Sequence, residues 1–373
     1  MSFQDLVKIQ LRQLEEPRFD ASLSGVSAYD PDNAENGYNL FDGKLIDMNG
    51  QLVKSWRSHY LSLLLPDGRY LAQEHYESQR WGLYSWNDQV IWEKDVPIHH
   101  DIVLTPQGSI LTLTKEVHPY KGRKVDFCSV VEYDMSGVEL QRYSTWENLS
   151  ELRSFHRPLE LERPKLFFLP ETAKRKKSSP WGGNYDYYRL NSIQVLPMTE
   201  LGKKDSRFRE GNWLISFRHG SMIFILDQDT KKVIWKCIDQ DIKGALEGQH
   251  APQLLPSGRL LIFDNGRYRG YTRVIEIDPI SLDILWEYRE EGLFTLSQGY
   301  VQRLSNGNTL VTESERGRAF EITKDKKIVW QYYFPEVQNA ANSQHPENFG
   351  RRQWIYRMRR YPKEFIEPLL KVG

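Results

Sequence analysis

A short phrase returns at intervals along this 373-residue chain, and it limits the possible folds more than any other feature. It consists of an apolar stretch, a tight turn and a second apolar stretch, and its fullest copy is GQHAPQLLPSGRLLIFDNG at 248–266. Other copies are LLLPDGRYLAQ at 63–73, IVLTPQGSILTL at 102–113, VQRLSNGNTLVTE at 301–313, and a shorter SIQVLP at 192–197 that continues in NWLISFRHG at 212–220. Repetition at such intervals predicts a repeat architecture.

A second phrase alternates with the first: a strand, a tight turn and a strand that ends in an aromatic residue. It occurs at 45–56, 83–92, 130–143, 224–235, 274–286 and 320–330. Five copies end in Trp and the third in Tyr, at Trp56, Trp92, Tyr143, Trp235, Trp286 and Trp330. Each unit therefore has two strands plus a hairpin. Four antiparallel strands repeated around an axis make a propeller, with blades of about forty to fifty residues.

The expected fold is all-β, a six-bladed β-propeller of four-stranded antiparallel blades over 37–362. The first hairpin has no preceding copy of the first phrase, so Trp354–Tyr361 is predicted to complete its sheet. The two ends of the chain would then close the ring and leave no free sheet edge. Apolar residues at roughly helical spacing in 3–15 predict a short N-terminal helix within 1–36, and 363–373 is assigned to a C-terminal tail.

One segment, 146–188, does not fit the repeat and is interpreted as a long inserted loop. Long insertions in compact domains are usually functional loops or disordered segments. The insertion carries the basic cluster KRKK at 174–177, which we interpret as part of a solvated loop rather than as a localisation signal. Its aromatic stretch at 181–188 is a candidate lid or wall over a pocket.

Alignment of the copies on their turns indicates a candidate site. Six residues before Pro66, Pro106, Pro197 and Pro256 stand Tyr60, His100, Asn191 and His250, and the same count from Ser305 gives Gly299. In a propeller, equivalent positions at the start of each first strand meet on one face. Polar groups gathered in one concave place on a rigid scaffold are typical of a ligand site. The alternative is that each histidine is simply a capped or solvated residue at a strand start.

Three further residues are candidates near that face. Arg218 ends the second strand of the blade that begins with SIQVLP. It is either a surface cation or, if it points to the axis, a planar donor suited to sulfate, phosphate or carboxylate oxygens. Tyr60 and Tyr300 either flank a flat substrate or belong to the core.

Composition excludes several classes of function. Lys plus Arg equals Asp plus Glu at 50 each, which argues against nucleic acid or an anionic membrane surface as a partner. Cys128 and Cys237 are too few for a disulfide framework and are expected to be buried thiols. His99, His100 and His250 lack paired metal-ligand spacing, so no metal and no other cofactor is predicted. With no signal peptide pattern and no run of membrane-spanning length, the expected location is the cytoplasm.

These phrases together resemble the arylsulfotransferase family of six-bladed propellers across roughly residues 37–362. The resemblance is carried by HHDIVLTPQGSIL, LNSIQVLP, LISFRHGSMIFILD, GQHAPQLLPSGRLLIFDNG, YVQRLSNGNTLVTES and RAFEITKDKKIVWQY. It implies transfer of a sulfuryl group from an aryl sulfate ester to a phenolic acceptor, without a nucleotide sulfate donor. It also implies that His250 becomes transiently sulfated and that His100, Arg218 and Asn191 complete the catalytic set.

The chain departs from the family in two respects. The histidine of the family's His-x-Asn-Ser phrase is Arg189 here, which keeps a positive charge for a sulfuryl oxygen but is no proton donor near neutral pH. The well-known family members are also exported and carry a disulfide, and neither feature is seen in this sequence. Arg189, His99, Tyr60 and Tyr300 are therefore assigned to substrate binding.

Three functions remain open from the sequence. The first is a sulfotransferase in which His250 is the nucleophile, His100 transfers the proton, and Arg218, Asn191 and Arg189 hold the sulfuryl oxygens. The second is a propeller that binds a ligand or protein without turnover, and the third is a different chemistry on the same scaffold. The sequence does not identify the donor, the acceptor or the oligomeric state.

Overall fold

The fold is a mainly-β six-bladed propeller with few helices, as the repeats predict. The computed structural model describes residues 23–57, 61–74, 78–156, 159, 185–336 and 352–372. The chain divides into two compact units. The first unit is Met1–Trp56, Phe263–Val274 and Glu287–Gly373, and the second is Arg57–Ile262 and Ile275–Trp286.

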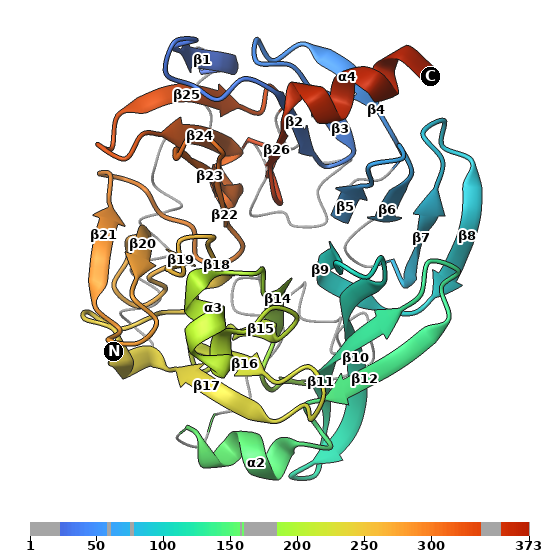
Figure 1. Ribbon diagram of the computed structural model, residues 1–373, viewed down its shortest axis with the longest axis vertical. Coiled ribbons are helices and arrows are strands. Elements are labelled where there is room, and N and C mark those ends of the chain that lie inside the picture. Colours follow the sequence, from blue (N-terminus) through green and yellow to red (C-terminus); the bar gives the residue numbers. More distant parts are fainter. Residues whose placement is uncertain are drawn as a thin grey trace, which may run out of the picture. The chain divides into compact units, whose positions relative to one another are not determined.

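Each blade is one sheet of neighbouring antiparallel strands (Figure 1). Blade 1 is β26 (Arg359–Tyr361), β2 (Tyr38–Phe41), β3 (Lys44–Ile46) and β4 (Leu52–Ser55). Blade 2 is β5 (Leu61–Leu64), β6 (Tyr70–Gln73), β7 (Arg80–Tyr84) and β8 (Val90–Asp95). Blade 3 is β9 (Ile98–Leu104), β10 (Ile110–Tyr120), β11 (Arg123–Tyr133) and β12 (Glu139–Ser144), with β13 (Tyr185–Asp186) paired in parallel to β11.

The other three blades follow the same order along the chain. Blade 4 is β14 (Leu190–Val195), β15 (Trp213–Phe217), β16 (Met222–Leu226) and β17 (Val233–Cys237). Blade 5 is β18 (His250–Leu254), β19 (Leu260–Asp264), β20 (Arg273–Ile277) and β21 (Ile284–Tyr288). Blade 6 is β22 (Tyr300–Arg303), β23 (Thr309–Glu313), β24 (Arg318–Ile322) and β25 (Ile328–Tyr333), with β1 (Gly25–Tyr29) as a fifth strand.

The described helices are short and stand outside the sheets. They are α2 (Leu149–Ser154), α3 (Glu200–Lys204) and α4 (Lys363–Val372), with 3-10 turns at η3 (Ser206–Phe208), η4 (Asp239–Asp241) and η5 (Ser314–Arg316). In the described part of the chain, no helix combines the length and apolar character that crossing a bilayer requires. The predicted helix at 3–15 lies outside the described residues.

The tryptophan that ends the hairpin phrase joins neighbouring blades. The indole Nε1–H of Trp92 in β8 donates to the backbone oxygen of Met135, in the turn between β11 and β12, at 2.9 Å. Trp235 donates to the oxygen of Pro279 in the turn between β20 and β21, also at 2.9 Å. A buried indole needs a partner for its N–H, and the turn of the following blade supplies one. The repeated tryptophan is therefore a contact between blades.

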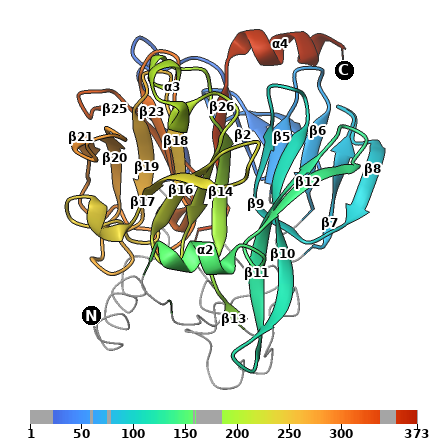
Figure 2. The same cartoon turned by 60° about the horizontal axis from the view of Figure 1, so that its bottom comes forward.

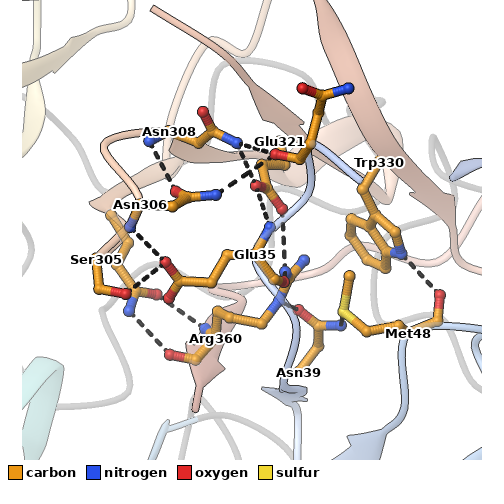
Figure 3. A network of polar contacts seen from close by, with 11 residues as sticks. Glu35, Asn39, Met48, Ser305, Asn306, Asn308, Glu321, Trp330 and Arg360 are labelled. Atoms are coloured by element: carbon orange, nitrogen blue, oxygen red, sulfur yellow. Dashed lines mark hydrogen bonds and ion pairs between the residues drawn. The ribbon is translucent and has the colours of Figure 1, made fainter. Parts of the chain in front are cut away.

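The two ends of the described chain meet within the first unit. Strand β26 pairs with β2, which confirms the prediction that Trp354–Tyr361 supplies a strand to the first hairpin. Strand β1 pairs with β25, and this pairing was not predicted because the segment was assigned to helix and loop. Arg360 of β26 is fully buried and bonds to Glu321 of β24, to Asn39 of β2 and to the backbone of Glu35 (Figure 3). This network fastens blade 1 to blade 6.

Blade 3 contains a hairpin that is longer than the rest of its sheet. Strands β10 and β11 pair over eleven residues each and turn at Lys121 and Gly122, where φ is +49° and +70°. Positive φ at both central residues fits the tight turns that match the strand twist. The far end of the hairpin pairs with β13, which ends the inserted segment (Figure 2).

The end of the insertion is anchored in the core of the second unit. Tyr187 and Tyr188 are buried in a cluster that includes Phe127 of β11 and Phe217 of β15. Tyr187 stacks on Phe127 with ring centroids 5.2 Å apart. These two tyrosines are therefore core residues, while 181–184 lie outside the described residues. Cys128 and Cys237 are buried and form no disulfide, as expected.

Candidate functional site

Three predicted site residues stand at the start of neighbouring strands in the second unit. His100 belongs to β9, Asn191 to β14 and His250 to β18, and β14 contacts both other strands (Figure 1). Their exposed fractions are 3%, 1% and 4%. The Asn191 Nδ2 donates to the backbone oxygen of Gln249 at 2.6 Å, which joins it to the residue before His250. The repeat positions thus do bring these side chains into one region.

The strands are irregular at these positions. The register of β9 with β10 shifts around His100 and Asp101, and that of β14 with β15 shifts at Asn191. Such bulges bend a strand and re-aim its side chains, and they are frequent next to active sites. The Asp101 side chain accepts from the backbone N–H of Ile193 at 3.2 Å, and the Thr112 hydroxyl donates to the Asp101 backbone oxygen at 2.8 Å. The first bond holds the bulge of β9 against β14, and the second holds it against β10.

Three residues of the region have left-handed backbones. The φ values are +64° at His100, +51° at Arg189 and +46° at Ala251. A non-glycine residue in this conformation costs about 1–3 kcal/mol and persists only where its surroundings impose it. The surrounding structure therefore maintains strain at two candidate site residues and directly after His250.

His99 and His100 form a pair. Their Nδ1 atoms are 2.6 Å apart, and the ring planes are nearly perpendicular at 88°. One of the two nitrogens must donate and the other accept, so the contact couples the tautomers of the two rings. Because the pair uses Nδ1 of His100, proton transfer by this ring would use Nε2. His99 is fully buried.

Burial and nearby cations keep both rings of the pair neutral. Burial lowers the pKa of His99 well below its ordinary value, and the charge of Lys115 lowers that pKa further. Burial also lowers the pKa of His100, and His99, Arg189 and His250 add to the decrease. A neutral imidazole at neutral pH is suited to accept a proton.

A buried ionic network extends from Arg189 into the blade. The Nη1 of Arg189 lies 2.8 Å from Oδ2 of Asp186, and the other oxygen of this carboxylate is 2.8 Å from Nζ of Lys115. Lys115 also lies 3.9 Å from Asp126. All four side chains are at most 8% exposed. Buried charges of this kind persist only when they are paired.

The charges of this network stabilise one another. Burial alone would raise the pKa of the Asp186 carboxyl, but Lys115 and Arg189 outweigh it and hold that pKa well below its usual range. Burial would lower the pKa of Lys115, yet Asp186 raises it above its ordinary value. Burial raises the pKa of the neighbouring Cys128 to about 12, so this cysteine remains a thiol.

Arg218 is oriented by the histidine that follows it. The Nδ1 of His219 lies 3.1 Å from the backbone oxygen of Tyr187, and because a carbonyl only accepts, Nδ1 carries the proton. The Nε2 of His219 then accepts from Nη1 of Arg218 at 3.3 Å. The backbone N–H of Arg218 donates to the oxygen of Arg189 at 3.0 Å. Both arginines therefore belong to one assembly.

The sequence model of the family described as Arylsulfotransferase (ASST) matches residues 82–335 of this chain. The chain belongs to the arylsulfotransferase family. The match spans every predicted site residue except Tyr60, and it includes Tyr300 in the first unit. No curated protein matches the chain.

Similar solved structures are distant in sequence. A protein of unknown function from Bacteroides caccae is 12% identical, with 87% of this chain and 100% of that chain covered and a TM-score of 0.49. A virginiamycin B lyase from Staphylococcus aureus is 12% identical, with 74% and 70% covered and a TM-score of 0.41. The Cps50 (Swd1) β-propeller domain of Myceliophteria thermophila is 13% identical, with 84% and 88% covered and a TM-score of 0.42. At these identities and TM-scores the three similarities carry no argument about this chain.

Tyr60, a further predicted site residue, lies outside the described residues. Tyr300 belongs to the first unit, where Arg357 and Arg359 lie 4.5 and 5.8 Å from its ring. Among the described residues, no group of three or more His, Cys, Asp or Glu side chains is arranged to hold a metal ion.

Sequence reasoning missed the residues that support the site. Lys115, Asp126 and Asp186 carry no motif, and the repeat assigns them no common position. His219 stands directly after Arg218, and this adjacency was the available signal.

Proposed function

We propose that this arylsulfotransferase-family protein transfers a sulfuryl group from an aryl sulfate ester to a phenolic acceptor through a sulfated His250. The observation that carries the proposal is the convergence, within one compact unit, of two histidines and two arginines at 3–9% exposure, namely His100, His250, Arg189 and Arg218. Sulfuryl transfer needs a nucleophile in line with the leaving oxygen and positive charge on the other oxygens. The assembly offers groups for both tasks.

In the first half-reaction, a ring nitrogen of neutral His250 attacks sulfur and the bond from sulfur to the aryl oxygen breaks. The aryl oxide leaves with the electron pair, and the sulfuryl group stays on the imidazole. Arg189 and Arg218 hold the sulfuryl oxygens through their guanidinium donors, and Asn191 adds the remaining N–H of its amide. Each such donor is typically worth about a hundredfold or more in kcat.

In the second half-reaction, His100 acts as the base. The acceptor phenol passes its proton to neutral His100 while its oxygen attacks sulfur and the nitrogen–sulfur bond breaks. Neutral His250 is regenerated, and the proton on His100 passes to the departed aryl oxide or to water. The lowered pKa of His100 supports this role better than that of an acid for the first leaving group.

The test uses 4-nitrophenyl sulfate as donor and phenol as acceptor. We expect release of nitrophenolate, formation of phenyl sulfate and, without acceptor, a sulfated His250 peptide in mass spectra. His250→Ala should abolish all three. His118→Ala is the matched control. His118 lies in the outer part of the long hairpin formed by β10 and β11, and its ring stacks on Trp146. Saturable binding of the ester with no turnover would instead establish a binding protein, and equal release by His250→Ala would exclude the sulfated histidine.

The proposal also assigns the reaction to the cytoplasm. Two buried thiols that form no disulfide are compatible with a reducing compartment. Cell fractionation with an antibody to the chain tests this assignment, and recovery in a periplasmic or membrane fraction would contradict it.

A further inference from the structure

Asp186 is the centre of the buried network beneath the candidate site. Its two oxygens face different cations, Arg189 at 2.8 Å on one side and Lys115 at 2.8 Å on the other. The residue is 1% exposed. A carboxylate this deeply buried is costly unless each oxygen has a charged or hydrogen-bonding partner. The presence of a buried carboxylate between two buried cations at this place therefore calls for a structural or functional explanation.

The inserted segment delivers this carboxylate. Asp186 lies in β13, which pairs in parallel with β11 so that Asp186 stands opposite Asp126. The backbone N–H of Tyr187 donates to the oxygen of Asp126 at 3.1 Å, and the Tyr187 ring is fixed in the core. The chain then reaches Arg189 with φ of +51° and enters β14. Asp186 is thus held by strand pairing only three residues before the arginine it contacts.

We propose that Asp186, held in turn by Lys115, is a positioning residue that aims the Arg189 guanidinium at the sulfuryl group of the substrate. This inference rests on the proposed function. A guanidinium has five N–H donors in a fixed fork, so the bond from Nη1 to Asp186 fixes the plane in which all of these donors lie. Lys115 also pairs with Asp186, so the negative charge of this carboxylate is divided between two cations. The carboxylate therefore does not neutralise the whole positive charge of Arg189.

The network also explains how an arginine can take the place of the family histidine. An arginine that lacks a fixed orientation loses side-chain freedom when it binds an anion. Here the buried carboxylate imposes the orientation before substrate arrives, which is the preorganisation that makes electrostatic catalysis efficient. The position then contributes fixed charge rather than a transferable proton.

A double-mutant cycle tests the inference. Asp186→Asn keeps the shape and removes the charge, and Arg189→Met removes the guanidinium. We expect each to lower kcat/KM for 4-nitrophenyl sulfate about ten- to a hundredfold. The double variant should be no worse than Arg189→Met, since the carboxylate acts only through the arginine. If Asp186 serves folding alone, the loss of kcat/KM in the double variant should equal the two single losses combined, or Asp186→Asn should show no loss.

Controls separate this inference from the proposed function. Glu321→Gln alters an equally buried ion pair, with Arg360, in the first unit, and it should leave kcat/KM unchanged once folding is verified by circular dichroism. If the wild type turns over and Asp186→Asn matches it, or if losses in the cycle add, the inference is overturned while the function stands.

If the wild type does not turn over, calorimetric binding of 4-nitrophenyl sulfate decides the matter. Equal weakening in Asp186→Asn, Arg189→Met and the double variant supports the positioning role without catalysis. Binding in Asp186→Asn at wild-type strength, or no binding to the wild type, overturns it.

Discussion

Replacement of Arg360 by Met should weaken the contact between blade 1 and blade 6. Arg360 and Glu321 are both fully buried, and their Nη1 and Oε2 atoms are 3.0 Å apart. The Nε of Arg360 donates to Asn39 at 2.5 Å, and its guanidinium lies 4.9 Å from the ring of Trp330. Figure 3 shows these groups around the arginine. Methionine keeps much of the apolar stem and removes every one of these donors.

The magnitude follows from the charge left behind. Without Arg360, the Glu321 carboxylate keeps Asn308 Nδ2 and the backbone N–H of Glu35 as donors, each at 2.7 Å, and loses its cation. Removal of one partner from a buried ion pair costs about 3–5 kcal/mol. A free energy of about 1.4 kcal/mol corresponds to a factor of ten in an equilibrium constant. The equilibrium constant for local opening of the contact between blades 1 and 6 should therefore rise between about a hundredfold and a few thousandfold.

Hydrogen exchange measures this opening directly. Amides of β26 and β2 should exchange faster by that factor in Arg360→Met, and urea denaturation should give the matching loss of stability. Arg359→Met on the same strand is the control and should cost less than about 1 kcal/mol. The double variant Arg360→Met/Glu321→Leu should recover most of the loss, because it removes the isolated charge. A loss below about 1 kcal/mol, or a double variant less stable than Arg360→Met, would refute the reasoning.

Three further predictions follow from individual residues. Trp330→Phe removes the N–H that donates to the Met48 oxygen at 2.9 Å, and should cost about 1–2 kcal/mol in urea denaturation; no loss would contradict the contact between blades. Burial raises the pKa of Glu313 from 4.5 to about 7, so the folded chain keeps a proton that the unfolded chain releases, and stability should fall as pH rises through this window. Glu313→Gln should remove this fall, measured as the urea midpoint at about pH 5 and pH 8; an unchanged slope would refute the assignment. The acid limb of kcat/KM should lie well below pH 6.5, since the pKa of His100 is lowered, and a limb at or above 6.5 would exclude His100 as the base.

The architecture was predictable because each blade repeats one pattern of strands and turns. The hairpin phrase ending in Trp recurs with little change, so six copies supported one another, and the missing strand of blade 1 had a single available source in Trp354–Tyr361. Strand β1 was not predictable in this way. It adds a fifth strand to blade 6 outside the repeat, and its sequence, GVSAY, has no matching copy elsewhere.

The same distinction applies within the candidate site. His100, Asn191 and His250 have a fixed place in the repeat, so counting from the turn proline found them without coordinates. Asp186 and Lys115 have no such place, because one ends an insertion and the other lies where β10 extends past the usual blade length. Their pairing depends on how the long hairpin and β13 fold against each other, which is long-range information. The repeat thus determines where the proposed nucleophile and base stand, while departures from the repeat supply the charged side chains that surround Arg189. Substitutions in the inserted segment should therefore affect the proposed anion binding by Arg189 more than they affect the positions of His100 and His250.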